Sequence, residues 1–199
     1  MKKLILILLF LICLQPLFSC QRAVSKSELE FFNETIFLDT DSIIYIKESS
    51  GWNNMKEKLS PKKNYYHDLY NNNPFELTSS EYKYILSEIK ANENYNWDSN
   101  LFINSERISQ SEARKYLKQK NRPINIEFDS ALKRHDTSAL INLKNRPYFA
   151  DSFSKPIFFR NNQFCIISYD CVAEDYSSDH GEVAIYKKVN EKWIRWVVL

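Results

Sequence analysis

The chain has 199 residues and carries 27 basic and 25 acidic side chains, so its formal net charge is +2. Aromatic residues make up 15% of the chain, which argues against disorder and can fill the core of one domain. Gly51 and Gly181 are the only glycines, which excludes the glycine-rich phosphate loops of P-loop and dinucleotide-binding enzymes.

The first predicted element is a signal peptide. Lys2 and Lys3 precede an apolar run over residues 4–14, which is shorter than the roughly 20 residues that a membrane-spanning helix needs. Residues 17–20, Leu-Phe-Ser-Cys, resemble a bacterial lipobox in which Cys20 accepts the lipid. The resemblance implies cleavage before Cys20, acylation of its thiol and an anchor in the lipid bilayer. The alternative is a secreted protein in which a cysteine follows the cleavage site by chance.

The position after the cysteine bears on the destination within the cell envelope. Gln21 is not the aspartate that retains many Gram-negative lipoproteins at the inner membrane, so the resemblance favours the outer membrane. We expect a signal peptide over residues 1–19, a lipidated tether over 20–27 and a single domain over 28–199.

Cleavage would also change the charge balance. Lys2 and Lys3 are the only charged side chains in residues 1–19, so their loss leaves 25 basic and 25 acidic side chains and a net charge of zero. A neutral protein lacks the long-range field that attracts nucleic acid phosphates, so we expect no nucleic acid partner.

The N-terminal half predicts helices that alternate with a strand. Serines at 25 and 27, each three residues before a glutamate, can cap a first helix. The β-branched and aromatic run over residues 42–46 predicts a strand that ends at the turn 49–51. Trp52, Met55 and Leu59 then recur at helical spacing.

Two further capping boxes predict two further helices. Thr78 and Glu81 precede apolar residues at helical spacing, which are Tyr82, Ile85, Leu86 and Ile89. Ser109 and Glu112 predict a shorter helix that ends before Pro123. After Pro123, the apolar residues Ile124, Ile126 and Phe128 alternate with polar residues, which predicts a half-buried strand.

The C-terminal part changes to an alternating pattern with a period of two. Four strands are predicted, over residues 156–160, 163–170, 182–189 and 192–198. Two links of hairpin length, 161–162 and 190–191, make the strands an antiparallel meander. In the last strand Trp193 and Val197 are expected on one face and Ile194, Trp196 and Val198 on the other. Short helices must cover this sheet, which predicts an α+β fold.

Several segments between residues 75 and 199 carry a family resemblance: residues 77–81, residues 97–102, Ser-Lys-Pro-Ile-Phe at 154–158, and Ile-Tyr-Lys-Lys at 185–188 before Lys192 and Trp193. They resemble a group of uncharacterised Gram-negative envelope lipoproteins. That group has no assigned catalytic residues, so the resemblance implies a location and a fold but no reaction.

Cysteines offer one candidate for chemistry. Cys13 would leave with the signal peptide and Cys20 would carry lipid, which leaves Cys165 and Cys171 in an oxidising compartment. In an extended strand these two are roughly 20 Å apart, so a disulfide requires the chain to fold back between them. A disulfide and two free thiols both remain open.

An acidic linker offers a second candidate, because carboxylates that converge on one point can bind a hard cation. The alternative is a solvated hairpin tip with its charges spread apart. The candidate ligands are Asp170, Glu174, Asp175, Asp179 and His180.

No catalytic constellation stands out in the sequence. His67 and His135 each precede an aspartate, but adjacent residues do not face each other on a helix or a strand. We expect no cofactor and name no catalytic residue. The favoured function is a non-catalytic envelope lipoprotein that binds a protein or glycan partner. The alternatives are a hydrolase of envelope polymers, which would use carboxylates such as Asp170, Glu174 and Asp175, and a carrier of small molecules or metals.

Overall fold

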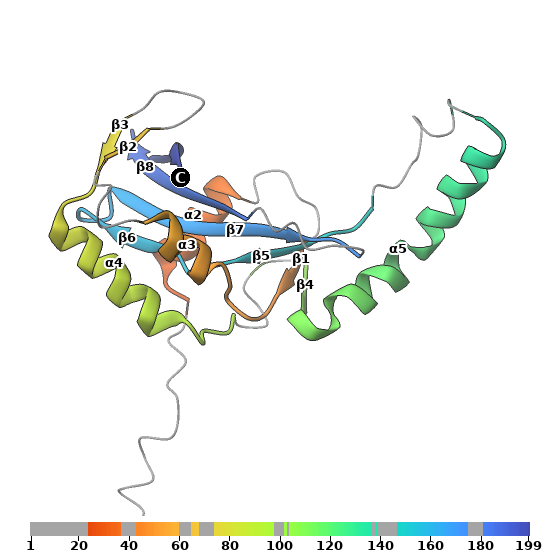
Figure 1. Ribbon diagram of the computed structural model, residues 1–199, viewed down its shortest axis with the longest axis horizontal. Helices are drawn as coiled ribbons and strands as arrows, with labels where there is room; N and C mark the ends of the chain where they lie inside the picture. Colours follow the sequence, from red (N-terminus) through yellow and green to blue (C-terminus); the bar gives the residue numbers. More distant parts are fainter. Residues whose placement is uncertain are drawn as a thin grey trace, which may run out of the picture.

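The computed structural model describes residues 24–36, 43–59, 65–67, 74–97, 102, 104–136, 138, 147–174 and 181–199. Its helices are α2 (Lys26–Thr35), α3 (Trp52–Lys58), α4 (Ser79–Asn92) and α5 (Gln110–Lys133). Its main sheet contains β1 (Ile43–Ile46), β4 (Ser105–Ile108), β5 (Ala150–Phe153), β6 (Ile157–Phe159), β7 (Phe164–Val172), β8 (Glu182–Val189) and β9 (Lys192–Val198). A separate hairpin pairs β2 (Tyr65–His67) with β3 (Pro74–Glu76). The predicted α+β fold is confirmed (Figure 1).

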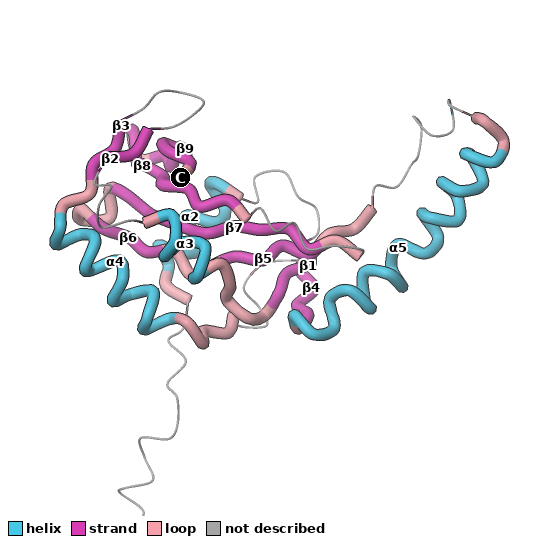
Figure 2. Tube along the Cα trace, viewed as in Figure 1, coloured by secondary structure: helices cyan, strands magenta, loops and turns pink. Residues whose placement is uncertain are grey.

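The main sheet is mixed. Its strand order is β4-β1-β5-β7-β8-β9, and β6 pairs with β7. The predicted antiparallel meander is present as β6 to β9, while β4, β1 and β5 run parallel to one another. The two hairpin links turn through positive φ angles, which asparagine tolerates better than most residues: Asn161 and Asn162 in one link and Asn190 in the other. Figure 2 shows the sheet crossing the body of the molecule, with α5 leaving it at one end.

Local caps start α2 and α4 where the sequence predicts. Ser25 and Glu28 form a reciprocal capping box at α2, and Thr78 and Glu81 form one at α4. Each box satisfies amide groups that the first helical turn leaves without a partner. Among the described residues, no helix is both long and apolar enough to cross a bilayer.

The prediction for residues 123–128 is wrong. They continue α5, which includes Pro123 and ends at Lys133. The buried positions of α5 follow a helical period through the whole length, and they are Ala113, Leu117, Asn121, Ile124 and Ala131. Ile126 and Phe128 are 58% and 42% exposed, because their alternation with polar residues places them off the buried stripe of the helix. Asn121 also holds the helix to the chain before β5, since its side chain accepts from Tyr148 N at 2.7 Å and donates to Tyr148 O at 3.0 Å.

The two faces of the sheet bury different clusters. The face covered by α2 is aromatic, with Phe31 and Phe32 packed against Tyr45, Phe153 and Trp193. On the other face, α3 and α4 bury an aliphatic and aromatic cluster near β6, β7 and β8. A smaller cluster on this second face lies under the start of α5 and includes Ile44, Ile46 and Val172.

The prediction that Trp193 and Val197 of β9 lie on the same face of the sheet is wrong. Trp193 belongs to the aromatic cluster under α2, whereas Val197 belongs to the cluster under α3 and α4. The pairing between β8 and β9 shifts there: Ile185 pairs with Val197 and Tyr186 with Arg195, so Trp196 is an extra residue in β9. Because such a bulge adds one residue to β9, the side chains beyond it point to the opposite face from the one that strict alternation predicts.

Candidate functional site

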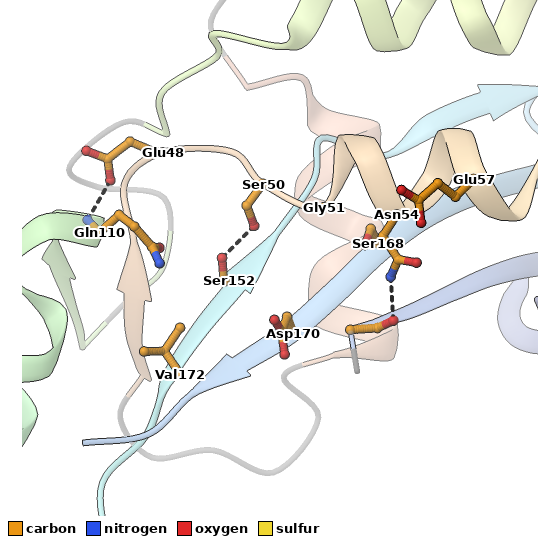
Figure 3. Close-up of a pocket in the computed structure, with 11 residues that line it drawn as sticks. Glu48, Ser50, Gly51, Asn54, Glu57, Gln110, Ser152, Ser168, Asp170 and Val172 are labelled. Atoms are coloured by element: carbon orange, nitrogen blue, oxygen red, sulfur yellow. Dashed lines mark hydrogen bonds between the residues drawn. The ribbon is translucent and has the colours of Figure 1, made fainter. Parts of the chain in front are cut away.

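A polar pocket of about 410 Å³ opens on the second face of the sheet, between α3 and the start of α5 (Figure 3). Strands β5 and β7 form its floor, and the segment from β1 to α3 forms one wall. Most of its described lining residues have polar side chains, and the lining consists of Glu48, Ser50, Gly51, Asn54, Glu57, Gln110, Ser152, Ser168, Asp170, Val172 and Gly181.

The pocket arises because the apolar side of β7 is interrupted. Ile166 belongs to the cluster under α3 and α4, and Val172 belongs to the cluster under α5. Between them on the same side of the strand stand Ser168 and Asp170. Ser152 of β5 pairs with Asp170, so it extends the polar area to the neighbouring strand. The two apolar clusters therefore leave a polar gap between them.

A tight turn brings the wall against this floor. Gly51 has a φ of +77°, in the left-handed region, and precedes α3. A β-carbon at Gly51 would stand 2.2 Å from Ser168 Oγ and 2.5 Å from Ser168 Cβ. Position 51 therefore needs glycine both for its backbone angle and for its contact with the strand.

Hydrogen bonds hold the wall to its neighbours. The hydroxyl oxygens of Ser50 and Ser152 lie 2.5 Å apart. Asn54 Nδ2 donates to the carbonyl oxygen of Gly181 at 2.5 Å. The amide of Gln110, in the first turn of α5, donates to Glu48 Oε2 at 2.9 Å, a contact that the dipole of the helix favours (Figure 3). These contacts fix the pocket before any ligand arrives.

One polar atom of the floor lacks a hydrogen-bond partner. Ser168 is 1% exposed, and its Oγ has no hydrogen-bond partner. The backbone of the same residue is satisfied, because its amide donates to Ser154 Oγ at 2.9 Å and its carbonyl accepts from Ser154 N at 2.9 Å. A buried hydroxyl without a partner is uncommon in native proteins and calls for an explanation.

The pocket carries an excess of negative charge. Glu48, Glu57 and Asp170 line it, and none of its described lining residues is Lys, Arg or His. Lys47 Nζ approaches Glu48 Oε1 at 3.6 Å, with both side chains about 40% exposed, so solvent screens that pair. Asp170 Oδ1 accepts the amide of Cys171 at 2.6 Å.

The candidate cysteines lie in β7. Cys165 is buried and Cys171 is partly buried, and both are free cysteines. Because β7 runs unbroken between them, the two do not pair in this conformation, and the free-thiol alternative is the one that the structure describes. Burial raises the pKa of the Cys165 thiol well above its usual value. Burial, followed by the charges of Asp151 and Asp170, raises the pKa of Cys171 to about 11.

The structure separates the candidate metal ligands that it describes. Asp170 lines the pocket, whereas Glu174 Oε1 accepts from Asn125 Nδ2 of α5 at 2.8 Å. The remaining candidates, Asp175, Asp179 and His180, lie outside the described residues, as does the predicted lipidation site Cys20. Within the described part of the chain, no three His, Cys, Asp or Glu side chains form a group that could hold a metal ion.

Sequence reasoning reached one pocket residue, Asp170, and missed the rest. A usable signal was present: Ser168 and Asp170 interrupt an otherwise apolar side of a predicted strand. Ser152 and Glu48 carried no such signal, because β5 is short and its pairing with β1 and β7 joins distant parts of the chain.

The lining side chains can bind through charge and hydrogen bonds. The described lining contains hydroxyls, amides and carboxylates, but no histidine or cysteine that could activate a serine as a nucleophile. In comparisons with protein-family models, with curated proteins and with solved structures, nothing matches the chain.

Proposed function

We propose that this protein is a lipid-anchored lipoprotein of the bacterial cell envelope, and that its domain is a non-catalytic binding module with the polar pocket as its binding site. The observation that carries the binding proposal is a preformed pocket of about 410 Å³ whose wall is held in place by hydrogen bonds and whose lining offers hydroxyls, amides and carboxylates. Binding sites are commonly formed before the ligand arrives and contain a few fixed polar groups.

The anchor rests on the sequence pattern. The lipobox-like segment 17–20 supplies Cys20, and acyl chains on that thiol would hold the domain to a membrane; the resemblance favours the outer membrane. The first helix, α2, begins at Lys26, six residues after Cys20, so the chain between them can span at most about 20 Å. The domain would therefore work close to the bilayer surface.

The pocket contains only one of the carboxylates that the sequence offers for hydrolysis. Of the two described candidates, Asp170 and Glu174, only Asp170 lines the pocket, where Glu48 and Glu57 are the other carboxylates. Glu174 accepts from Asn125 instead. A carrier of apolar molecules would need mostly apolar side chains around its pocket, and eight of the eleven described lining residues carry polar ones.

Two experiments test the proposal in the native cell. For the anchor, an alkyne-bearing fatty acid should label the wild-type protein and not a Cys20→Ala variant, and absence of label on the wild type would contradict it. For the pocket, a photo-crosslinking side chain replaces Asn53, which is exposed on α3 beside the pocket. We expect a crosslinked partner that is lost when Glu57 is changed to Arg.

The crosslink needs a matched control. Glu127 is an exposed carboxylate on α5 outside the pocket, so Glu127→Arg makes the same charge change elsewhere. The crosslinked partner should persist in this control variant. A wild-type protein without any crosslink at position 53, or a crosslink that survives Glu57→Arg, would overturn the pocket as the binding site.

A further inference from the structure

We propose that the exposed side of α5 docks on the anionic phospholipid surface of the membrane that carries the anchor. The inference goes beyond the pocket, and it rests on the proposed function only for the lipid anchor that holds the domain at a bilayer. The surface concerned, here called the basic stripe, runs along one side of α5. It consists of Lys115, Lys118, Arg122, Ile126, Asp129 and Lys133.

The basic stripe lies on the side of α5 that faces away from the core. Its members follow one another at intervals of three or four residues, which aligns them along one side of a helix. Arg122 and Ile126 each lie two residues from the buried Ile124, and two residues turn a helix by roughly 200°. All six side chains of the stripe are exposed. The stripe therefore offers solvent a straight edge, roughly 27 Å long from Lys115 to Lys133.

Positive charge is concentrated on the first part of this helix. Residues 113–126 hold five basic side chains and no acidic one. Lys120 forms an ion pair with Glu106. The other four are exposed and form no ion pair among the described residues; they are Arg114, Lys115, Lys118 and Arg122. Because the chain without residues 1–19 is neutral as a whole, this charge is a local feature that fits a partner with many negative groups.

Exposed apolar side chains on the same helix favour a bilayer as that partner. Ile126, within the stripe, is 58% exposed, and Phe128 and Leu132 are 42% and 46% exposed. They belong to the later part of α5, which projects from the body of the molecule in Figure 2. Helices that lie on membranes combine basic side chains, which meet the headgroups, with apolar ones that enter the acyl boundary. A purely charged partner would neutralise the basic side chains and leave these three in water.

The anchor keeps the helix near such a surface. Since α2 begins six residues after Cys20, the tether can extend at most about 20 Å. Figure 1 shows the start of the described chain and the first turn of α5 along the same, lower edge of the body. A second contact with the bilayer is then intramolecular, so α5 meets the lipid surface at a high effective concentration. Basic segments close to an anchor are attracted to anionic lipids in this way.

A fluorescent reporter beside the stripe tests the docking. Gln119 is exposed on α5, and a Gln119→Cys variant can be labelled with the dye NBD ahead of the native Cys165 and Cys171, which are buried and partly buried. The labelled mature lipoprotein is reconstituted in phosphatidylcholine vesicles with and without phosphatidylglycerol. We expect a blue-shifted emission that nitroxide-labelled lipid quenches only in the anionic vesicles. About 1 M salt should remove the shift, because it reduces the Debye length to roughly 3 Å.

Matched charge variants assign the docking to the stripe. A triple variant should weaken docking by roughly a hundredfold, because each basic side chain at an anionic surface contributes a factor of roughly five. Its substitutions are Lys115→Gln, Lys118→Gln and Arg122→Gln. The control variant removes the same charge from exposed lysines of α3 and α4 and should keep the blue shift. Its substitutions are Lys58→Gln, Lys83→Gln and Lys90→Gln.

Several results would overturn the inference: equal emission in the two kinds of vesicle, equal loss in the control variant, or a shift produced by soluble polyglutamate and not by anionic vesicles. The last result would assign the stripe to an acidic protein. If the fatty acid labels Cys20 while the reporter stays in water, this inference fails and the proposed function stands.

If Cys20 carries no lipid, the reporter is read after the unlipidated native protein is mixed with anionic vesicles. A blue shift there would refute the proposed anchor and support the stripe as a lipid-binding surface. An unchanged emission would overturn both.

Discussion

Gly51 and Ser168 are packed so closely that neither position can gain an atom on the side facing the other. A β-carbon on Gly51 would stand 2.2 Å from Ser168 Oγ, well inside van der Waals contact. The contact joins the turn before α3 to the centre of β7, two segments more than a hundred residues apart in sequence. It thereby sets the distance between the wall and the floor of the pocket.

Gly51→Ala should lower the free energy of unfolding by about 2 kcal/mol or more, because it adds both a strained φ and a steric clash. Urea denaturation of the variant measures this loss. Gly181→Ala is the matched control, since its β-carbon would come no closer than 3.3 Å to Asp170 Cβ and we expect a smaller effect. Equal destabilisation by the two variants would contradict the special role of position 51.

Ser168→Ala should leave stability unchanged or raise it by up to about 1 kcal/mol, because it removes a buried hydroxyl that has no partner. Ser154→Ala is the control: Ser154 Oγ accepts the Ser168 amide, so its loss should destabilise the protein by about 1–3 kcal/mol. Thermal denaturation of both variants measures the two changes in stability. A large loss of stability in Ser168→Ala would show that its hydroxyl supports the fold.

Local signals in the sequence predicted the parts of the fold that local chemistry decides. The capping box at Thr78 and Glu81 and the asparagine links of the C-terminal hairpins need only neighbouring residues, so their pattern is readable. The second half of α5 was missed for two reasons. Pro123 was taken as the end of the helix, and the apolar residues Ile124, Ile126 and Phe128 alternate with polar ones as they would in a short strand. The facing of β9 was missed because the bulge at Trp196 depends on the pairing with β8.

The site was harder to predict than the fold. Its residues come from segments whose proximity is set by the parallel pairing of β1 with β5, a contact between distant parts of the chain. β4 and β5 have four residues each, of which three are polar in β4 and two in β5, so neither gives a clear strand signal. The acidic loop drew attention by composition alone, yet only Asp170 of that group lines the pocket among the residues described.

Acid should weaken the contact that ties α4 to the turn after β6. Arg160 donates to both carboxylate oxygens of Glu81, at 2.6 and 3.0 Å, and these bonds lower the pKa of Glu81 from 4.5 to about 2. A lowered carboxyl pKa contributes stability that is complete above pH 4.5 and is lost as the pH falls toward 2. Glu81→Gln should therefore cost about 1 kcal/mol or less at pH 7 and progressively less below pH 4.5.

Urea midpoints of wild type and Glu81→Gln between pH 7 and pH 3 measure this convergence. Glu88→Gln on the same helix is the control, since Glu88 forms no ion pair among the described residues, and its effect should not depend on pH in this way. A gap between wild type and Glu81→Gln that stays constant over the range would contradict the assignment.

Asp151→Asn should stabilise the protein at neutral pH. Burial raises the pKa of Asp151, and the hydrogen bond of 2.6 Å from the Tyr169 hydroxyl offsets the rise only in part. A raised carboxyl pKa means that the folded state holds its proton more tightly than the unfolded state, so the ionised group disfavours folding above that pKa. Asparagine keeps an oxygen that accepts from Tyr169 without the charge. The melting temperature should rise by a few degrees at pH 7.5, and the gain should shrink toward pH 4; a loss at pH 7.5 would contradict the prediction.

The thiols of the native mature protein should react slowly. With a pKa of about 11, Cys171 holds roughly a thousandth of its population as thiolate at pH 8, and a pKa near 9 would give about a tenth, so alkylation should be roughly a hundredfold slower than in the unfolded chain. Cys165 is completely buried and should react only on unfolding. Iodoacetamide labelling followed by peptide mass spectrometry measures both rates, with Cys171→Ser to assign the faster site.

Asp151→Asn should speed labelling at Cys171, because it removes one of the charges that raise this pKa. Two thiols that stay unlabelled after unfolding without reductant would instead show a disulfide, and β7 could not then run unbroken from Cys165 to Cys171.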